Sequence, residues 1–212
     1  MTDHTGSRES KKPRARVLLL ALLLSLATGS WTGVLANDGA NDGANDATAA
    51  EESGFTKNEI IESANSFFGA TTAGLADVVE KAFQDHGRPN AYITGEEVSG
   101  AVGVGVKYGR GDLNFKSGGA RKVFWQGPTV GFDFGGNASK IFVLVYNLET
   151  ADALFQRFPG GEGSIYVVGG VGMHYLQSDG VILAPIKTGV GLRAGVNVGY
   201  MHFTREASWN PF

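Results

Sequence analysis

The residues best suited to chemistry lie on the glycine-rich side of the predicted strands. Asp133 lies between two phenylalanines and shares its side of the strand with glycines, as Arg193 and Asn197 do in a later strand. We predict that Asp133 and Arg193 come within ion-pair or hydrogen-bond reach across the sheet. If that face is buried, leaving either charge alone would cost about 3 to 5 kcal/mol. Separate solvation of the two charges is the alternative, and a ligand site built from Asp133, Arg193 and Asn197 is a further hypothesis.

A second group of candidate residues is basic. Within a stretch of sixteen residues only Asp112 opposes five cations, which are Lys107, Arg110, Lys116, Arg121 and Lys122. Lysine and arginine bind phosphate oxygens. These residues therefore predict a contact surface for anions such as lipid phosphate or polysaccharide, with a solvated hairpin as the alternative.

The remaining side chains do not form a recognisable catalytic or metal-binding pattern. Cysteine is absent, which excludes a thiolate nucleophile, a disulfide framework and every cysteine-ligated metal site. Only four histidines remain, and no serine lies in the Gly-x-Ser-x-Gly pattern of a hydrolase. Glu96 and Glu97 could form a carboxylate pair, but neighbours in a strand point to opposite faces. We predict no catalytic residue, no cofactor and no metal.

The elements that position these candidates are strands from about residue 90 onward. Hydrophobic residues alternate with glycine in 102–109 and 190–200, so that one face is aliphatic and the other is mostly glycine. Further strands are predicted at 123–125, 129–134, 141–146, 164–175 and 181–186, a short helix at 149–158, and a hairpin turn at Asp179-Gly180. Glycine inside strands marks sharp bends, so the pattern predicts a tightly curled antiparallel sheet, as in a small closed barrel.

An amphipathic helical segment is predicted over residues 55–89, ahead of the strands. Thr56 and Glu59 have the spacing of a capping box, and apolar residues then recur at helical spacing with a break near 69–71. Gly87 and Pro89 end the pattern. We expect this segment to pack on the sheet.

The first 36 residues have the layout of a secretory signal peptide. Five basic residues precede an uncharged apolar run over 17–26, and small residues at 34–36 suit a cleavage site. The run is shorter than the roughly 20 residues that span a bilayer. We therefore expect export, with no transmembrane segment after cleavage, followed by a disordered polar tether over 37–54. Cleavage changes the net charge from −3 to −6, which gives no drive toward nucleic acid.

The folded part carries five motifs that indicate a family resemblance. They are Tyr-Ile-Thr-Gly-Glu-Glu at 92–97, Phe-Trp-Gln-Gly-Pro-Thr-Val-Gly-Phe-Asp-Phe-Gly-Gly-Asn at 124–137, Leu-Val-Tyr-Asn-Leu at 144–148, Gly-Val-Gly-Leu-Arg at 189–193 and Trp-Asn-Pro-Phe at 209–212. Over 55–212 the chain resembles the envelope integrity protein A (EipA) family, exported bacterial proteins of unknown molecular activity. More distantly, its glycine spacing is similar to that of SYLF lipid-binding domains. The first resemblance implies a small soluble periplasmic barrel that helps to keep the envelope intact, and supplies no catalytic residues.

We therefore expect a mainly β fold, a small antiparallel soluble β-barrel over 90–212 with an N-terminal amphipathic helical segment and one short inserted helix. The expected protein is periplasmic and not an enzyme, and it binds an envelope lipid, glycan or protein. Two alternatives stay open, namely an enzyme that acts on envelope polysaccharide or lipid and an outer-membrane β-barrel.

Overall fold

The computed structural model describes residues 54–69, 73–133, 138–160, 165–189, 199–208 and 210. All of them belong to one compact unit, Ala40–Phe212. The predicted signal peptide and nearly all of the predicted tether lie outside the described residues and stay predictions. The described elements are α2 (Lys57–Phe68), α3 (Leu75–His86), β1 (Ala91–Phe115), β2 (Ala120–Asp133), β3 (Ser139–Tyr146), the 3-10 helix η1 (Ala151–Leu154), β4 (Arg157–Pro159), β5 (Tyr166–Val168), β6 (Val171–Met173), β7 (Leu176–Ser178), β8 (Val181–Thr188) and β9 (Tyr200–Thr204).

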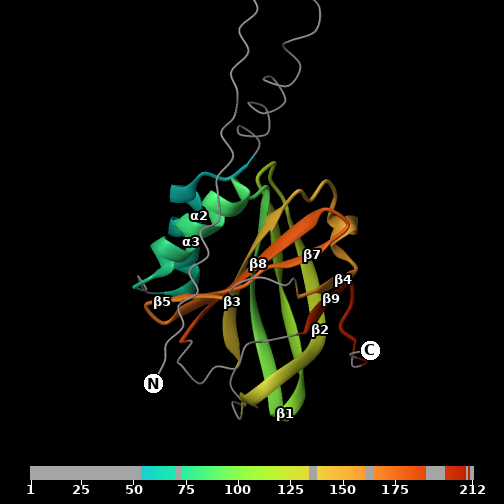
Figure 1. Ribbon diagram of the computed structural model, residues 1–212. Helices are drawn as coiled ribbons and strands as arrows, with labels where there is room; N and C mark the ends of the chain where they lie inside the picture. Colours follow the sequence, from blue (N-terminus) through green and yellow to red (C-terminus); the bar gives the residue numbers. More distant parts are fainter. Residues whose placement is uncertain are drawn as a thin grey trace, which may run out of the picture. The chain divides into compact units, whose positions relative to one another are not determined.

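The described strands form one antiparallel sheet that curls into a barrel-like shape (Figure 1). Its order is β4-β9-β2-β1-β3-β8-β6-β5, and β7 also pairs with β8. A bridge between Gly160, which follows β4, and Leu176 in β7 joins the β4 end of this path to the strand that branches from β8. The predicted fold class, mainly β with an antiparallel barrel and N-terminal helices, is confirmed.

Strand β1 is long because it pairs with two strands, β3 and β2, and folds back on itself between the two paired parts. Its first part pairs with β3, from Ala91↔Val145 onward, and its second part pairs with β2. The two ends meet where the Lys116 N–H donates to the Asn90 carbonyl at 3.0 Å. Gly95 and Gly111 approach so closely that a Cβ on Gly95 would lie 2.9 Å from the Cα of Gly111. Glycine at both positions therefore permits the strand to fold onto itself.

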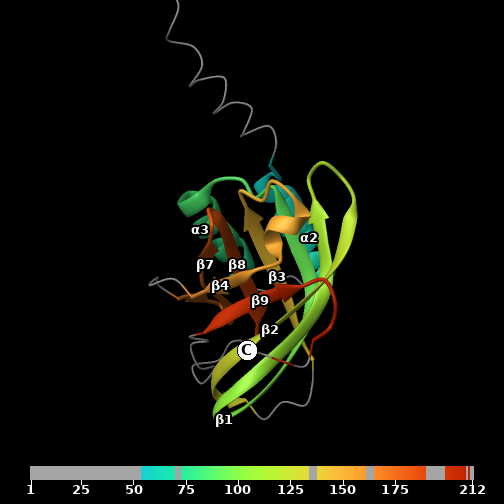
Figure 2. The same cartoon turned by 90° about the vertical axis from the view of Figure 1, so that its right-hand side faces the viewer.

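The sheet has a hydrophobic core on each side of β3 and β8. One core fills the inside of the curl with residues such as Ile93, Trp125 and Phe203. The other lies between the outer side of β3 and β8 and the two helices, with Phe142 among its buried residues. Figure 2 shows the helices behind this part of the sheet, with β4 and β9 toward the viewer. Residues at positions 141–146 of β3 are consequently buried on both faces.

The helical segment forms as its capping residues predict. The Thr56 side chain accepts from the Glu59 N–H, and the Glu59 carboxylate accepts from the Thr56 N–H, which is a complete capping box. Gly69 ends α2 with a φ of 79°. Hydrogen bonds from Lys116 and then from Thr56 lower the pKa of Glu59 to about 2. Among the described residues, no helix is both long enough and apolar enough to cross a membrane.

Two predicted elements were wrong in detail. Residues 164–175 are not one strand, because Gly169 and Gly170 both have positive φ and turn the chain between β5 and β6. The predicted helix over 149–158 is shorter, since η1 ends at Leu154 and the chain then enters β4. Most of the predicted strand over 190–200 lies outside the described residues, and β9 begins at Tyr200.

Candidate binding groove and interior charged cluster

A groove of about 480 Å³ lies on the outer face of β1 and β2, beside the end of α2. We call it the strand groove. Most of its strand side chains come from even-numbered positions, which share one face because the side chains of a strand alternate. The charged members are Glu96, Arg110, Asp112 and Lys122. The groove therefore combines cations and carboxylates on one exposed surface.

Aromatic rings complete the strand groove. Phe67 from α2 and Phe124 from β2 line it. Phe67 is held in place by Lys140, whose ammonium donates to the Phe67 carbonyl at 2.7 Å and lies 5.4 Å from its ring centroid. Lys122 pairs with Asp112 at 3.1 Å, and its side chain is 77% exposed. Such a surface offers a ligand both hydrogen-bonding groups and apolar ring faces.

A second feature lies inside the curl, on the odd-numbered face of β1. Glu97 is fully buried there, while Glu96 points out into the strand groove. The indole N–H of Trp125 donates to Glu97 Oε2 at 2.9 Å, and the ammonium of Lys187 bonds Glu97 Oε1. Lys107 is buried beside them and His174 completes the group. We call Glu97, Lys107, Trp125, His174 and Lys187 the interior charged cluster.

The electrostatics of the cluster follow from burial and from its two lysines. Burial acts to raise the pKa of Glu97, but the charges of Lys187 and Lys107 outweigh it, and the pKa lies below its usual value. Burial lowers the pKa of Lys107, and the charge of Glu97 opposes that effect. Burial, then Lys107 and Lys187, lower the pKa of His174 to about 4. At neutral pH the cluster therefore contains an ionised carboxylate and an uncharged imidazole.

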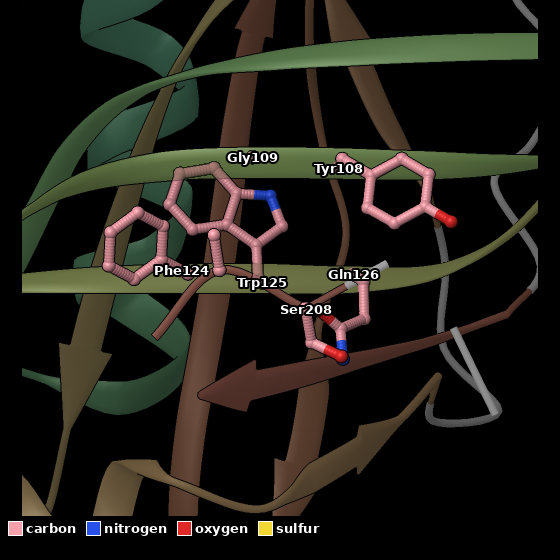
Figure 3. Close-up of a pocket in the computed structure, with 7 residues that line it drawn as sticks. Tyr108, Gly109, Phe124, Trp125, Gln126 and Ser208 are labelled. Carbon is pink, nitrogen blue, oxygen red and sulfur yellow. The ribbon is translucent and has the colours of Figure 1, made fainter. Parts of the chain in front are cut away.

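A smaller pocket of about 90 Å³ lies where the C-terminal segment passes β1 and β2. Figure 3 shows Tyr108, Trp125, Gln126 and Ser208, four of the residues that line it. Gln126 is buried, and its side chain donates to the Asn210 carbonyl at 3.1 Å. This contact attaches the C-terminal segment to β2.

Comparison with known proteins places the chain in a family. The family model described as envelope integrity protein A matches residues 53–212, most of the chain. The chain belongs to the EipA family. Among solved structures, it is similar to the crystal structure of a beta-barrel-like, uncharacterised protein from Brucella abortus, with 49% identity, a TM-score of 0.69, and coverage of 76% of this chain and 99% of that one. No curated protein matches.

The structure of this EipA-family chain leaves the predicted Asp133–Arg193 pair untested. Asp133 is the last residue of β2 and pairs with Ala101 through the backbone. Arg193 and Asn197 lie outside the described residues. The ion pair and the ligand site built from these three residues stay predictions.

The structure separates the five predicted basic contact residues. Arg110 and Lys122 line the strand groove. Lys116 bonds Glu59, and Arg121 bonds Asp152 at 3.2 Å. Lys107 is only 2% exposed and lies in the interior charged cluster, so it does not belong to an outer surface. Its odd-numbered position had placed it on the glycine side of the strand, and this side turned out to face the interior.

Sequence reasoning missed Glu97, Lys187 and His174 as members of one cluster. They come from β1, from β8 and from the link between β6 and β7, so no sequence spacing joins them. One signal was present, because the alternation of each strand places Glu97 and Lys187 opposite their neighbours Glu96 and Ile186, although it does not show which face is inside. Among the described residues, no group of acidic residues and histidines has an arrangement that could hold a metal ion.

Proposed function

We propose that this protein supports envelope integrity from the periplasm by binding an envelope component, a lipid, glycan or protein, in the strand groove. The observation that carries the proposal is the groove itself, an open surface where Arg110, Glu96 and Phe124 are presented together. Membership in the envelope integrity family supports the cellular role. The predicted signal peptide supports the proposed location in the periplasm.

The chemistry of the groove suits binding more than bond cleavage. Lys122 and Asp112 pair with each other on the exposed surface, where an ion pair is weak and readily exchanged for contacts to a ligand. Arginine gives planar, bidentate contacts to phosphate and carboxylate. The ring of Phe124 offers an apolar face beside these groups. A ligand that displaces water from this surface gains contacts of both kinds.

The test is a binding assay with a charge reversal inside the groove. Arg110→Glu should reduce capture of the protein on immobilised lipopolysaccharide or on phosphatidylglycerol vesicles at least tenfold. Lys57→Glu is the matched control, because Lys57 starts α2 and lies about 15 Å along that helix from Phe67. Affinity capture from an envelope extract, with the lipids, glycans and proteins identified, then names the component.

The proposal predicts a specific pattern of results. Binding should weaken as salt rises, since an exposed charged surface is screened. Equal binding by the unmodified protein and Arg110→Glu would contradict a role for the groove. A change in the mass of lipopolysaccharide or peptidoglycan after incubation with the protein would show that the protein is an enzyme, and would contradict a function limited to binding.

A further inference from the structure

The interior charged cluster holds more basic than acidic side chains. One carboxylate, Glu97, faces two lysines, Lys107 and Lys187. Lys187 forms a direct ion pair with Glu97. Lys107 is 2% exposed and interacts with the same carboxylate electrostatically. Burying a charge without full compensation is expensive. An anion entering the cluster would offset this imbalance.

An unsatisfied polar atom lies at the same place. Nε2 of His174 is buried and has no hydrogen-bond partner within the part of the chain that the structure describes. The charges of Lys107, Lys187 and Glu97 all act on this imidazole, which places it beside the cluster. A neutral imidazole can donate one hydrogen bond from Nε2. Buried polar atoms are normally satisfied, so this atom points to a ligand or an ordered water.

Two members of the cluster, Lys187 and His174, are partly exposed. The side chain of Lys187 is 26% exposed, whereas that of Glu97 is 1% exposed. Lys187 lies near the end of β8, opposite Gly172 of β6. The cluster therefore meets solvent on the side of Lys187. The mouth of a curled sheet is a common place for a ligand site.

We propose that the interior charged cluster binds an acidic group, a phosphate or a carboxylate, through Lys107 and His174, with Lys187 at its entrance. Both lysines supply N–H donors, a bound anion favours the protonated form of Lys107, and Nε2 supplies a directional hydrogen bond. Glu97 holds Lys187 in place and offsets part of the repulsion between the two lysines. This site is separate from the strand groove, because Glu97 and Glu96 point to opposite sides of β1. The acidic group can belong to a free anion or to the end of a larger envelope molecule.

The experiment follows the ring signals of His174 by NMR in the purified, ¹³C-histidine-labelled protein at pH 7. Inorganic phosphate, acetate and water-soluble dihexanoyl phosphatidic acid are titrated, each against sodium chloride at the same ionic strength. We expect saturable shifts of His174, assigned with the variant His174→Gln, while His86 on α3 stays unchanged. Lys107→Met should weaken the apparent affinity at least tenfold, and the matched control Lys57→Met, at the start of α2 and outside both sites, should bind normally.

The outcomes separate the sources of the acidic group. Tighter binding of the phosphatidic acid than of phosphate indicates a lipid-borne group, and binding of phosphate or acetate alone indicates a free anion. Absence of a saturable shift in the unmodified protein with all three probes would overturn the proposal, as would equal shifts in Lys107→Met. If Lys107→Met does not fold, Lys187→Met takes its place and should show the same loss. A failed groove assay leaves this result unaffected, since Arg110→Glu does not touch the cluster.

Discussion

At the scale of single residues, Gly109 makes the interior charged cluster possible. Gly109 pairs with Trp125 across β1 and β2, and a Cβ at this position would lie 2.0 Å from the Trp125 ring. The indole therefore occupies space that any side chain would fill, as Figure 3 shows. From there its N–H reaches the buried carboxylate of Glu97. Glycine on this face therefore makes room for the large ring of Trp125, in addition to permitting strand curvature.

The variant Gly109→Ala should lower the free energy of unfolding by about 2 to 3 kcal/mol, because the added methyl group overpacks a filled core. Urea denaturation followed by circular dichroism measures this change. Gly100→Ala is the matched control, since nothing lies within 4 Å of a Cβ at Gly100, and it should change stability by less than about 0.5 kcal/mol. Equal effects of the two substitutions would show that Trp125 does not lie against Gly109.

At the scale of elements, the first turn of α2 is fastened to the sheet by one basic residue. Lys116 follows β1 and bonds both carboxylate oxygens of Glu59, at 2.6 and 2.8 Å. Its ammonium also lies 5.1 Å from the ring centroid of Phe55. The same carboxylate closes the capping box with Thr56. Lys116 was predicted to contact anionic ligands, but in the structure its partner is Glu59 of the same chain.

Removal of this cation should raise the pKa of Glu59. The hydrogen bond from Lys116 is the largest cause of the lowered value of about 2, so Lys116→Met should move the pKa toward the ordinary 4.5. The ¹³C signal of the Glu59 carboxyl, followed from pH 7 to pH 1.5, reports the midpoint.

The sign of the linked stability follows from the direction of the shift. A lowered carboxyl pKa contributes stability above about 4.5, which is lost as the pH falls through about 2. Lys122→Met is the matched control and should leave the midpoint of Glu59 unchanged. A midpoint near 4.5 in the unmodified protein would refute the contact between Lys116 and Glu59.

At the scale of the whole molecule, function depends on the compartment that the chain reaches. A periplasmic binding role requires that residues 1–36 direct export and are removed. The membership in the envelope integrity family agrees with an exported protein. The groove and the cluster both belong to the unit that follows this segment.

A charge placed in the apolar run should block export. Leu20→Arg interrupts the uncharged stretch 17–26 and should leave the full-length chain in the cytoplasm, whereas Asp46→Arg, placed beyond the cleavage site, should be exported normally. Mass spectrometry of the unmodified protein should find Asn37 at the mature N-terminus. Osmotic shock without detergent should release it, and recovery only with detergent would favour the outer-membrane barrel.

The amino-acid sequence by itself determined the features that depend on neighbouring residues. The capping box at Thr56 and the break after α2 at Gly69 were predicted because their hydrogen bonds and backbone angles are local. The turn at Asp179-Gly180 was predicted for the same reason, and both residues have positive φ. The two-residue alternation likewise predicted that Glu96 and Glu97 point to opposite faces, although not which face is inside.

The tertiary structure alone decided which polar residues meet. The curl of the sheet turns the glycine side of β1 inward, and it brings Glu97, Lys187 and His174 together from three separate segments. Strand order and curvature depend on the packing of the entire sheet, so no spacing in the chain encodes these contacts. The same curvature buried Lys107 and left Arg110 outside, and it thereby divided one basic run between an interior cluster and a surface groove.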